Sequence, residues 1–75
     1  MGSIRVGVVG TGALGSQHTR IYADMARVGL LQFSGVYDAD STRAAAIAEK
    51  FGVTVAESME ALADRCDALS VVTPT

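Results

Sequence analysis

Three glycines carry the clearest chemical signal in this sequence. Gly10, Gly12 and Gly15 directly follow a run of apolar residues at positions 4–9. Gly10 allows a tight turn out of a strand, and Gly12 leaves room for a pyrophosphate to approach the backbone. Gly15 lets a following helix pack closely, and the N-terminal N–H groups of such a helix attract phosphate. The spacing therefore predicts a phosphate-binding loop.

An acidic residue lies at the separation that a dinucleotide site requires. Asp38 ends a second apolar segment, about 20 residues beyond Gly15, where a carboxylate can accept hydrogen bonds from both ribose hydroxyls and repel a 2′-phosphate. Loop and acid together predict a dinucleotide site that prefers NAD. Two alternatives stay open: Asp38 as a turn or helix-cap residue, and NADP as the ligand, since Ser41 and Arg43 could receive a 2′-phosphate.

Other reactive side chains are few. His18 is the only histidine and lies on an apolar helical stripe, so we expect a partly buried, hydrogen-bonded structural residue. Cys66 is the only cysteine, which excludes an internal disulfide and favours a plain thiol over a nucleophile. One histidine and one cysteine cannot build a zinc site. We therefore predict no catalytic and no metal-binding residue in this chain.

Strands and helices alternate along the chain. The first predicted helix begins near Ala13 and ends at Gly29, with an apolar stripe at helical spacing that consists of Leu14, His18, Ile21, Met25 and Val28. Asp40 and Ser58 are the expected N-caps of a second and a third helix, and Gly52 closes the second. The predicted strands cover residues 4–9, 30–38, 53–55 and 68–72.

This β-α-β-α-β-α-β alternation implies an α/β fold of the Rossmann type, with a partial parallel sheet joined by right-handed crossovers. We expect the strand order 3-2-1-4. The order would then reverse between the first and fourth strands, so that the Gly10 loop and residues 73–75 border one crevice at the carboxyl edge of the sheet. The ligand should bind in that crevice.

Composition limits the partners. The 75 residues can form one small domain at most, 49% of them are hydrophobic, and the net charge is −2. Since there is no basic run, we expect neither nucleic acid nor an anionic membrane surface as a partner. The apolar stretches are of strand length, too short for a membrane span or signal peptide. With its single cysteine, the chain is expected to be cytoplasmic.

Four stretches resemble a known family: VGVVGTGALGSQH, VYDAD, AEKFG, and the last strand running into Thr73, Pro74 and Thr75. Over its whole length the chain is similar to the amino-terminal part of the Gfo/Idh/MocA oxidoreductases. The resemblance implies a Rossmann domain followed by a larger carboxyl-terminal α/β domain that holds the substrate. It also implies hydride transfer between a nicotinamide and a carbon of a sugar, polyol or cyclitol.

The same resemblance assigns cofactor-binding residues. It implies that the loop residues wrap the pyrophosphate, that Asp38 holds the ribose, and that the last three residues pass beside the nicotinamide ribose. The full set is Gly10, Thr11, Gly12, Ala13, Leu14, Gly15, Asp38, Thr73, Pro74 and Thr75.

Parts of the family pattern are missing. The Glu-Lys-Pro motif and the acid/base residue of the second domain do not occur in residues 1–75. We therefore expect these residues to be the amino-terminal part of a Rossmann domain, inactive alone, whose unpaired sheet edge promotes association, such as a homo-oligomer. Two alternatives remain: a non-catalytic nucleotide-binding or redox-sensing module, and a site for FAD or a methyl donor.

Overall fold

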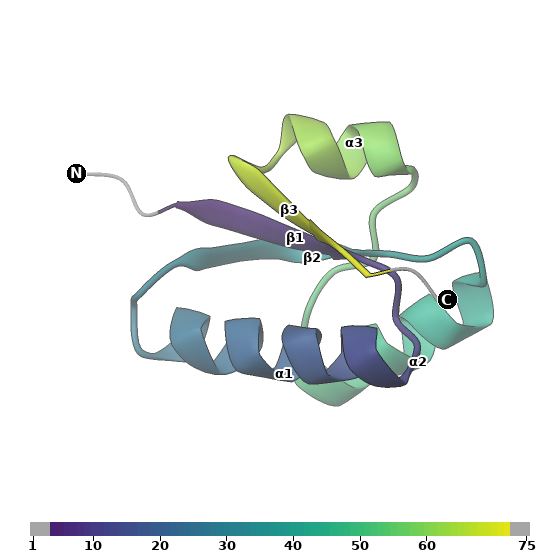
Figure 1. Cartoon of the computed structure of the whole chain (residues 1–75), viewed down its shortest axis with the longest axis horizontal. Helices are drawn as coiled ribbons and strands as arrows, with labels where there is room; N and C mark the ends of the chain where they lie inside the picture. Colours follow the sequence, from purple (N-terminus) through teal and green to yellow (C-terminus); the bar gives the residue numbers. More distant parts are fainter. Residues whose placement is uncertain (1–3, 73–75) are drawn as a thin grey trace.

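A parallel sheet of three strands forms the middle layer of the protein (Figure 1). The computed structural model describes residues 4–72, with the side chains of all of these except Ala13 and Leu14. The strands are β1 (Arg5–Val9), β2 (Gln32–Tyr37) and β3 (Ala68–Val71), in the order β2-β1-β3. β1 takes the central position because its valines are buried on both faces of the sheet. This confirms the predicted α/β fold with a parallel sheet.

The predicted third strand, residues 53–55, is reduced to a single bridge. Val55 pairs in parallel with Val36, and the N–H of Val36 donates to the carbonyl of Thr54 (2.9 Å). This segment lies on the side of β2 away from β1, but the predicted order 3-2-1-4 is not fully formed. The segment has room for only one bridge because it must leave Gly52 at the end of one helix and reach Ser58 at the start of the next.

The helices cover both faces of the sheet. α1 (Ala13–Arg27) and α2 (Ser41–Phe51) lie on one face, and α3 (Met59–Asp64) lies on the other (Figure 1). The predicted caps are confirmed: Asp40 accepts from the Arg43 N–H at the start of α2 (3.1 Å), and Ser58 accepts from the Ala61 N–H in α3 (3.0 Å). In residues 4–72, every helix is too short or too polar to span a membrane.

Each face has its own apolar core. Val8 and Val36 pack with Ala48 of α2 on one face. On the other face, Val9 packs with Leu62 of α3 and with Ala56, which precedes that helix. Val8 and Val9 face opposite cores because side chains alternate along a strand. The central strand therefore holds both layers together, and it ends directly at the Gly10 loop.

The buried face of α1 differs from the predicted apolar stripe. Ile21 and Val28 of that stripe are 48% and 71% exposed, whereas Thr19 is fully buried. Gly15 is also buried, and the Thr19 hydroxyl donates to its carbonyl (2.9 Å). Small residues let the start of α1 come close to the sheet, so the helix turns this narrow face inward and the larger aliphatic side chains outward.

Candidate functional site

The three loop glycines have different surroundings. Gly10 has φ +98°, and a Cβ there would overlap the carbonyl oxygen of Val72. A Cβ on Gly15 would overlap the carbonyl oxygen of Gly10. Among the side chains that the structure describes, a Cβ on Gly12 would meet only the Arg43 guanidinium, 3.6 Å from Nη1. The packing of the protein itself thus requires glycine at the first and third positions, while the middle glycine leaves an open face of backbone.

This open face lies at the N-terminus of α1. Gly12 is the N-cap of α1 and provides no side-chain cap, whereas the side chains of Asp40 and Ser58 cap α2 and α3. The first N–H groups of a helix have no partner within the helix, and the helix dipole adds positive potential there. The first turn of α1 contains no acidic residue that would offset this potential. An anion such as a pyrophosphate can therefore be bound at this end of α1.

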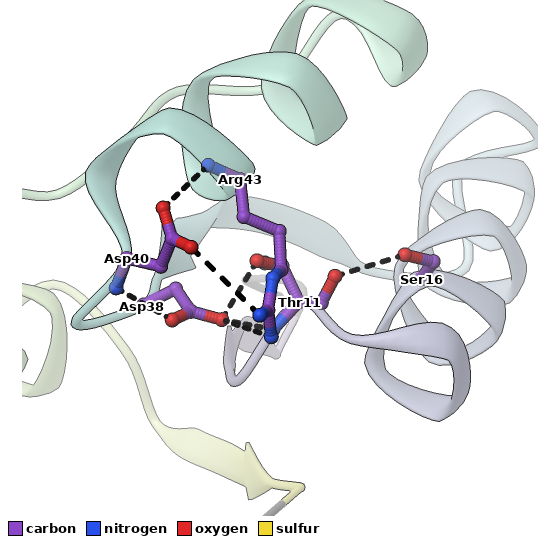
Figure 2. A network of polar contacts seen from close by, with 5 residues as sticks. All are labelled: Thr11, Ser16, Asp38, Asp40 and Arg43. Carbon is purple, nitrogen blue, oxygen red and sulfur yellow. Dashed lines mark hydrogen bonds and ion pairs between the residues drawn. The ribbon is translucent and has the colours of Figure 1, made fainter.

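Asp38 is fixed against the loop by a network of hydrogen bonds (Figure 2). The N–H of Thr11 and its hydroxyl both donate to Asp38 Oδ2, at 2.7 and 2.8 Å. The N–H of Asp40 donates to the other oxygen, Oδ1, at 2.8 Å. On the loop side, the Ser16 hydroxyl donates to the Thr11 carbonyl (3.1 Å). The carboxylate is thereby held between the loop, the end of β2 and the start of α2.

Arg43 supplies the nearest positive charge. Its Nη1 lies 3.9 Å from Asp38 Oδ2, and its Nη2 lies 3.8 Å from Asp40 Oδ2. Both distances exceed hydrogen-bond length, and half of the Arg43 side chain is exposed, so both ion pairs are weak. The Asp40 amide, the two Thr11 donors and Arg43 together hold the pKa of Asp38 below its ordinary value, although burial opposes this. Asp38 is therefore a carboxylate at neutral pH.

The ends of the strands meet at the loop. Gly10 donates its N–H to the Tyr37 carbonyl at the end of β2 (2.8 Å), and Val72 donates to the Val9 carbonyl (2.8 Å). Val72 thus lies beside Gly10 at the carboxyl edge, where the predicted crevice should be. The predicted residues Thr73, Pro74 and Thr75, and the side chains of Ala13 and Leu14, lie outside the part of the chain that the structure describes.

Two other candidates have structural surroundings. His18 is half-buried, and its Nδ1 lies 3.2 Å from the Ser70 hydroxyl on β3, which confirms the predicted hydrogen-bonded histidine. Cys66 is a free, half-buried thiol packed beside the core of Val9 and Leu62. Within residues 4–72, no three potential metal ligands come together.

The hydroxyl of Thr11 was the contact that sequence reasoning missed. Thr11 is expected to wrap the pyrophosphate, yet the residue is only 2% exposed and its hydroxyl donates to Asp38. The role of Ser16 was also missed, because both contacts depend on how the loop folds. The available signal was the position of a hydroxyl residue between two glycines of the loop, with a second hydroxyl on the next turn.

Comparison with known proteins supports a common origin for this loop and sheet. The chain is 39% identical over 72 residues to the UDP-N-acetylglucosamine 3-dehydrogenase of Acidithiobacillus ferrooxidans, covering 96% of this chain and 21% of that enzyme. A solved structure of that enzyme superposes with a TM-score of 0.86, over all of this chain and 23% of that one. This chain thus spans about a fifth of the length of the relatives it matches.

Two further solved structures have the same fold. GenD2 from gentamicin A biosynthesis, in complex with NAD, is 28% identical with a TM-score of 0.72, over all of this chain and 21% of that one. A dehydrogenase from Clostridium difficile, named MviM, is 21% identical with a TM-score of 0.79, over 96% of this chain and 23% of that one, and supports the fold alone.

A sequence model of one protein family matches residues 4–75, nearly the whole chain, and is described as an oxidoreductase family with an NAD-binding Rossmann fold. The Gly10 loop, the uncapped start of α1 and the carboxylate at the end of β2 are the parts that such a fold uses for a dinucleotide. The chain belongs to the Gfo/Idh/MocA family of oxidoreductases and is part of its NAD-binding Rossmann fold.

Proposed function

We propose that residues 1–75 are the amino-terminal part of the cofactor-binding domain of an NAD-dependent dehydrogenase. In this proposal a separate carboxyl-terminal domain of the whole protein holds the substrate. The observation that carries the proposal is the contrast within the loop: packing encloses Gly10 and Gly15, while Gly12 leaves an open face beside the N-terminus of α1. That open face fits a pyrophosphate.

The roles of the site residues follow from this placement. The loop from Gly10 to Gly15, which includes Thr11, Ala13 and Leu14, would wrap the pyrophosphate. The N–H groups of Gly10 and Thr11 already donate to Tyr37 and Asp38, so N–H groups in the first turn of α1 would bind it, and Asp38 would accept hydrogen bonds from the adenosine ribose. Thr73, Pro74 and Thr75 would lie beside the nicotinamide ribose, since β3 brings Val72 next to Gly10. The bound nicotinamide would accept or donate the hydride. Residues 1–75 would bind and orient it, and we assign them no proton-transfer group.

We propose a sugar, polyol or cyclitol hydroxyl as the site of oxidation. The support is similarity: a relative that is 39% identical is a UDP-N-acetylglucosamine 3-dehydrogenase, and a solved relative belongs to gentamicin A biosynthesis. The low count of cysteines favours a cytoplasmic protein.

NADP is a second candidate cofactor, and Arg43 is the observation that favours it. The guanidinium lies 3.9 Å from Asp38 and 3.6 Å from the Cβ position at Gly12, next to the place proposed for the adenosine ribose. A guanidinium at that place can bind a 2′-phosphate, whereas the Asp38 carboxylate repels one. Arg43 therefore favours NADP, whereas Asp38 favours NAD.

The test is Gly12→Ala. Among the described residues only Arg43 is within reach of a Cβ at Gly12, so the variant should lose no more than about 1 kcal/mol in the free energy of unfolding, the cost of alanine at an N-cap. The added methyl group would fill the space proposed for the pyrophosphate and should weaken NAD binding by about tenfold or more. Amide NMR titration with NAD, and then with NADP, measures both affinities and reports which residues shift. Equal NAD affinity in variant and wild type would contradict the proposed site.

A further inference from the structure

Thr11 makes two of the hydrogen bonds that fix Asp38. Its N–H and its hydroxyl both reach Oδ2, at 2.7 and 2.8 Å, and the Asp40 N–H holds Oδ1 at 2.8 Å. A carboxylate whose two oxygens are both bound cannot rotate about its Cβ–Cγ bond without breaking a bond. The orientation of the Asp38 carboxylate is thus fixed without a ligand, and the loop residue Thr11 holds one of its two oxygens.

Thr11 is itself held firmly. The residue is buried, with 2% of its surface exposed, and its carbonyl accepts from the Ser16 hydroxyl on the first turns of α1 (3.1 Å). The preceding residue, Gly10, donates its N–H to Tyr37 on β2 (2.8 Å). The Thr11 hydroxyl therefore has a fixed position, and its hydrogen bond fixes the Asp38 carboxylate relative to the loop (Figure 2).

The donors to Asp38 are all neutral. Thr11 and the Asp40 amide carry no formal charge, and the Arg43 guanidinium stays 3.9 Å away, outside hydrogen-bond length. An ionised carboxylate has about four acceptor positions on its two oxygens, and Oδ1 accepts only one hydrogen bond from the residues described here. Asp38 thus keeps both negative charge and acceptor capacity for hydroxyl groups.

We propose that Thr11 is a positioning residue for cofactor choice: its hydroxyl holds Asp38 in the orientation that accepts the adenosine ribose hydroxyls and repels a 2′-phosphate. This inference rests on the proposed function, because it takes Asp38 as the ribose-binding residue. It goes beyond that proposal by assigning selectivity to a loop side chain that need not touch the cofactor.

Thr11→Val removes the hydroxyl, keeps the N–H bond to Asp38 and preserves the shape of the side chain. NAD affinity should fall about fivefold, the equivalent of one hydrogen bond, and NADP affinity should fall less than about twofold. The NAD preference of the chain therefore decreases. Thr11→Ser retains a hydroxyl and should restore the preference. If the valine variant folds poorly, Thr11→Ala replaces it in the test. This variant also removes the hydroxyl, adds no methyl group, and should likewise lower the NAD preference.

Thr19→Val is the matched control. Thr19 is fully buried, and its hydroxyl makes one hydrogen bond, to the Gly15 carbonyl (2.9 Å), without contact to Asp38. This variant should leave the ratio of NAD to NADP affinity unchanged. A second readout is the carboxyl ¹³C shift of Asp38 against pH. Its midpoint should rise in Thr11→Val, because the Thr11 hydroxyl helps to lower the pKa of Asp38, and it should stay unchanged in Thr19→Val.

The outcomes separate the inference from the proposed function. If Thr11→Val and Thr19→Val leave the NAD to NADP ratio equal to that of the wild-type chain, while Asp38→Ala changes it, Thr11 is only structural and the inference is overturned. If Asp38→Ala also leaves the ratio unchanged, the proposed ribose contact is wrong, and the inference is overturned with it. A drop in the ratio for Thr11→Val and Thr11→Ala, restored in Thr11→Ser, supports it.

Discussion

Two aspartates at opposite ends of the sheet have different environments. Asp67 precedes β3 at the amino edge and accepts from the Arg5 N–H (2.8 Å) and from Arg5 Nη2 (3.1 Å). Asp38 follows β2 at the carboxyl edge and accepts from Thr11 and Asp40. The Asp67 side chain is 45% exposed, whereas that of Asp38 is 13% exposed.

The difference shows how partners decide the use of a carboxylate. The guanidinium of Arg5, on the neighbouring strand β1, neutralises the charge of Asp67, so this ion pair joins β1 to the start of β3. The bonds to Asp38 come from neutral donors, and its cation stays beyond hydrogen-bond distance, so its charge remains available. An exposed ion pair adds little stability, whereas a fixed carboxylate whose nearest cation lies beyond hydrogen-bond distance can recognise a ligand. The three predictions below test this contrast between the two edges.

The largest effect is expected from a comparison of two of the positive-φ glycines, one at each edge of the sheet. Gly10→Ala forces a Cβ onto the Val72 carbonyl oxygen at φ +98°, and it should lower the free energy of unfolding by about 3 kcal/mol or more. Gly29, at the amino edge, has φ +83°, and no atom of residues 4–72 lies near its Cβ position, so Gly29→Ala should cost about 1 kcal/mol. Urea denaturation measures both values. Equal losses would show that close packing at the carboxyl edge has no special role.

An intermediate effect is expected when each aspartate is replaced by asparagine. Asp38→Asn removes the charge proposed to hold the ribose hydroxyls and should weaken NAD binding about tenfold, or about 1.4 kcal/mol. Asp67→Asn, at the other edge, should leave NAD affinity within about twofold, because surface pairs contribute little at a distance. Calorimetric titration of the two variants provides the comparison. A larger loss in Asp67→Asn would contradict the assignment of the site to the carboxyl edge.

The smallest expected effect is a decrease in the free energy of unfolding at acidic pH. The Arg5 side chain and then its N–H lower the pKa of Asp67, while the Asp40 amide and then Thr11 lower that of Asp38. A carboxyl with a lowered folded pKa stabilises the protein fully above its unfolded pKa of about 3.9, and this contribution is lost as pH falls through the folded value.

Urea midpoints measured from pH 6 to pH 2 should therefore decrease below about pH 4. Each asparagine variant should show a shallower decrease than the wild-type chain, because one of the two carboxyls with a lowered pKa is gone. A variant with the same decrease as wild type would show that its aspartate has equal pKa values in the folded and unfolded chain.

Much of this protein was determined by local sequence. The caps at Asp40, Gly52 and Ser58 define both ends of α2 and the start of α3, because each acts on backbone groups a few residues away. The spacing of the glycines and the position of Asp38 predict the loop and its acid, because both lie at the ends of strands with a clear apolar pattern. The parallel sheet follows from the alternation of strands and helices.

Tertiary structure alone decided the rest. Which face of α1 is buried depends on the close approach at Gly15, so the apolar spacing of Ile21 and Val28 was a poor guide. Whether residues 53–55 form a strand depends on how many residues can pair with β2. The bonds from Thr11 to Asp38 join residues far apart in sequence, and they form only when β1 and β2 pair in register. Local patterns place residues on elements, but only the packed sheet sets the distances between them.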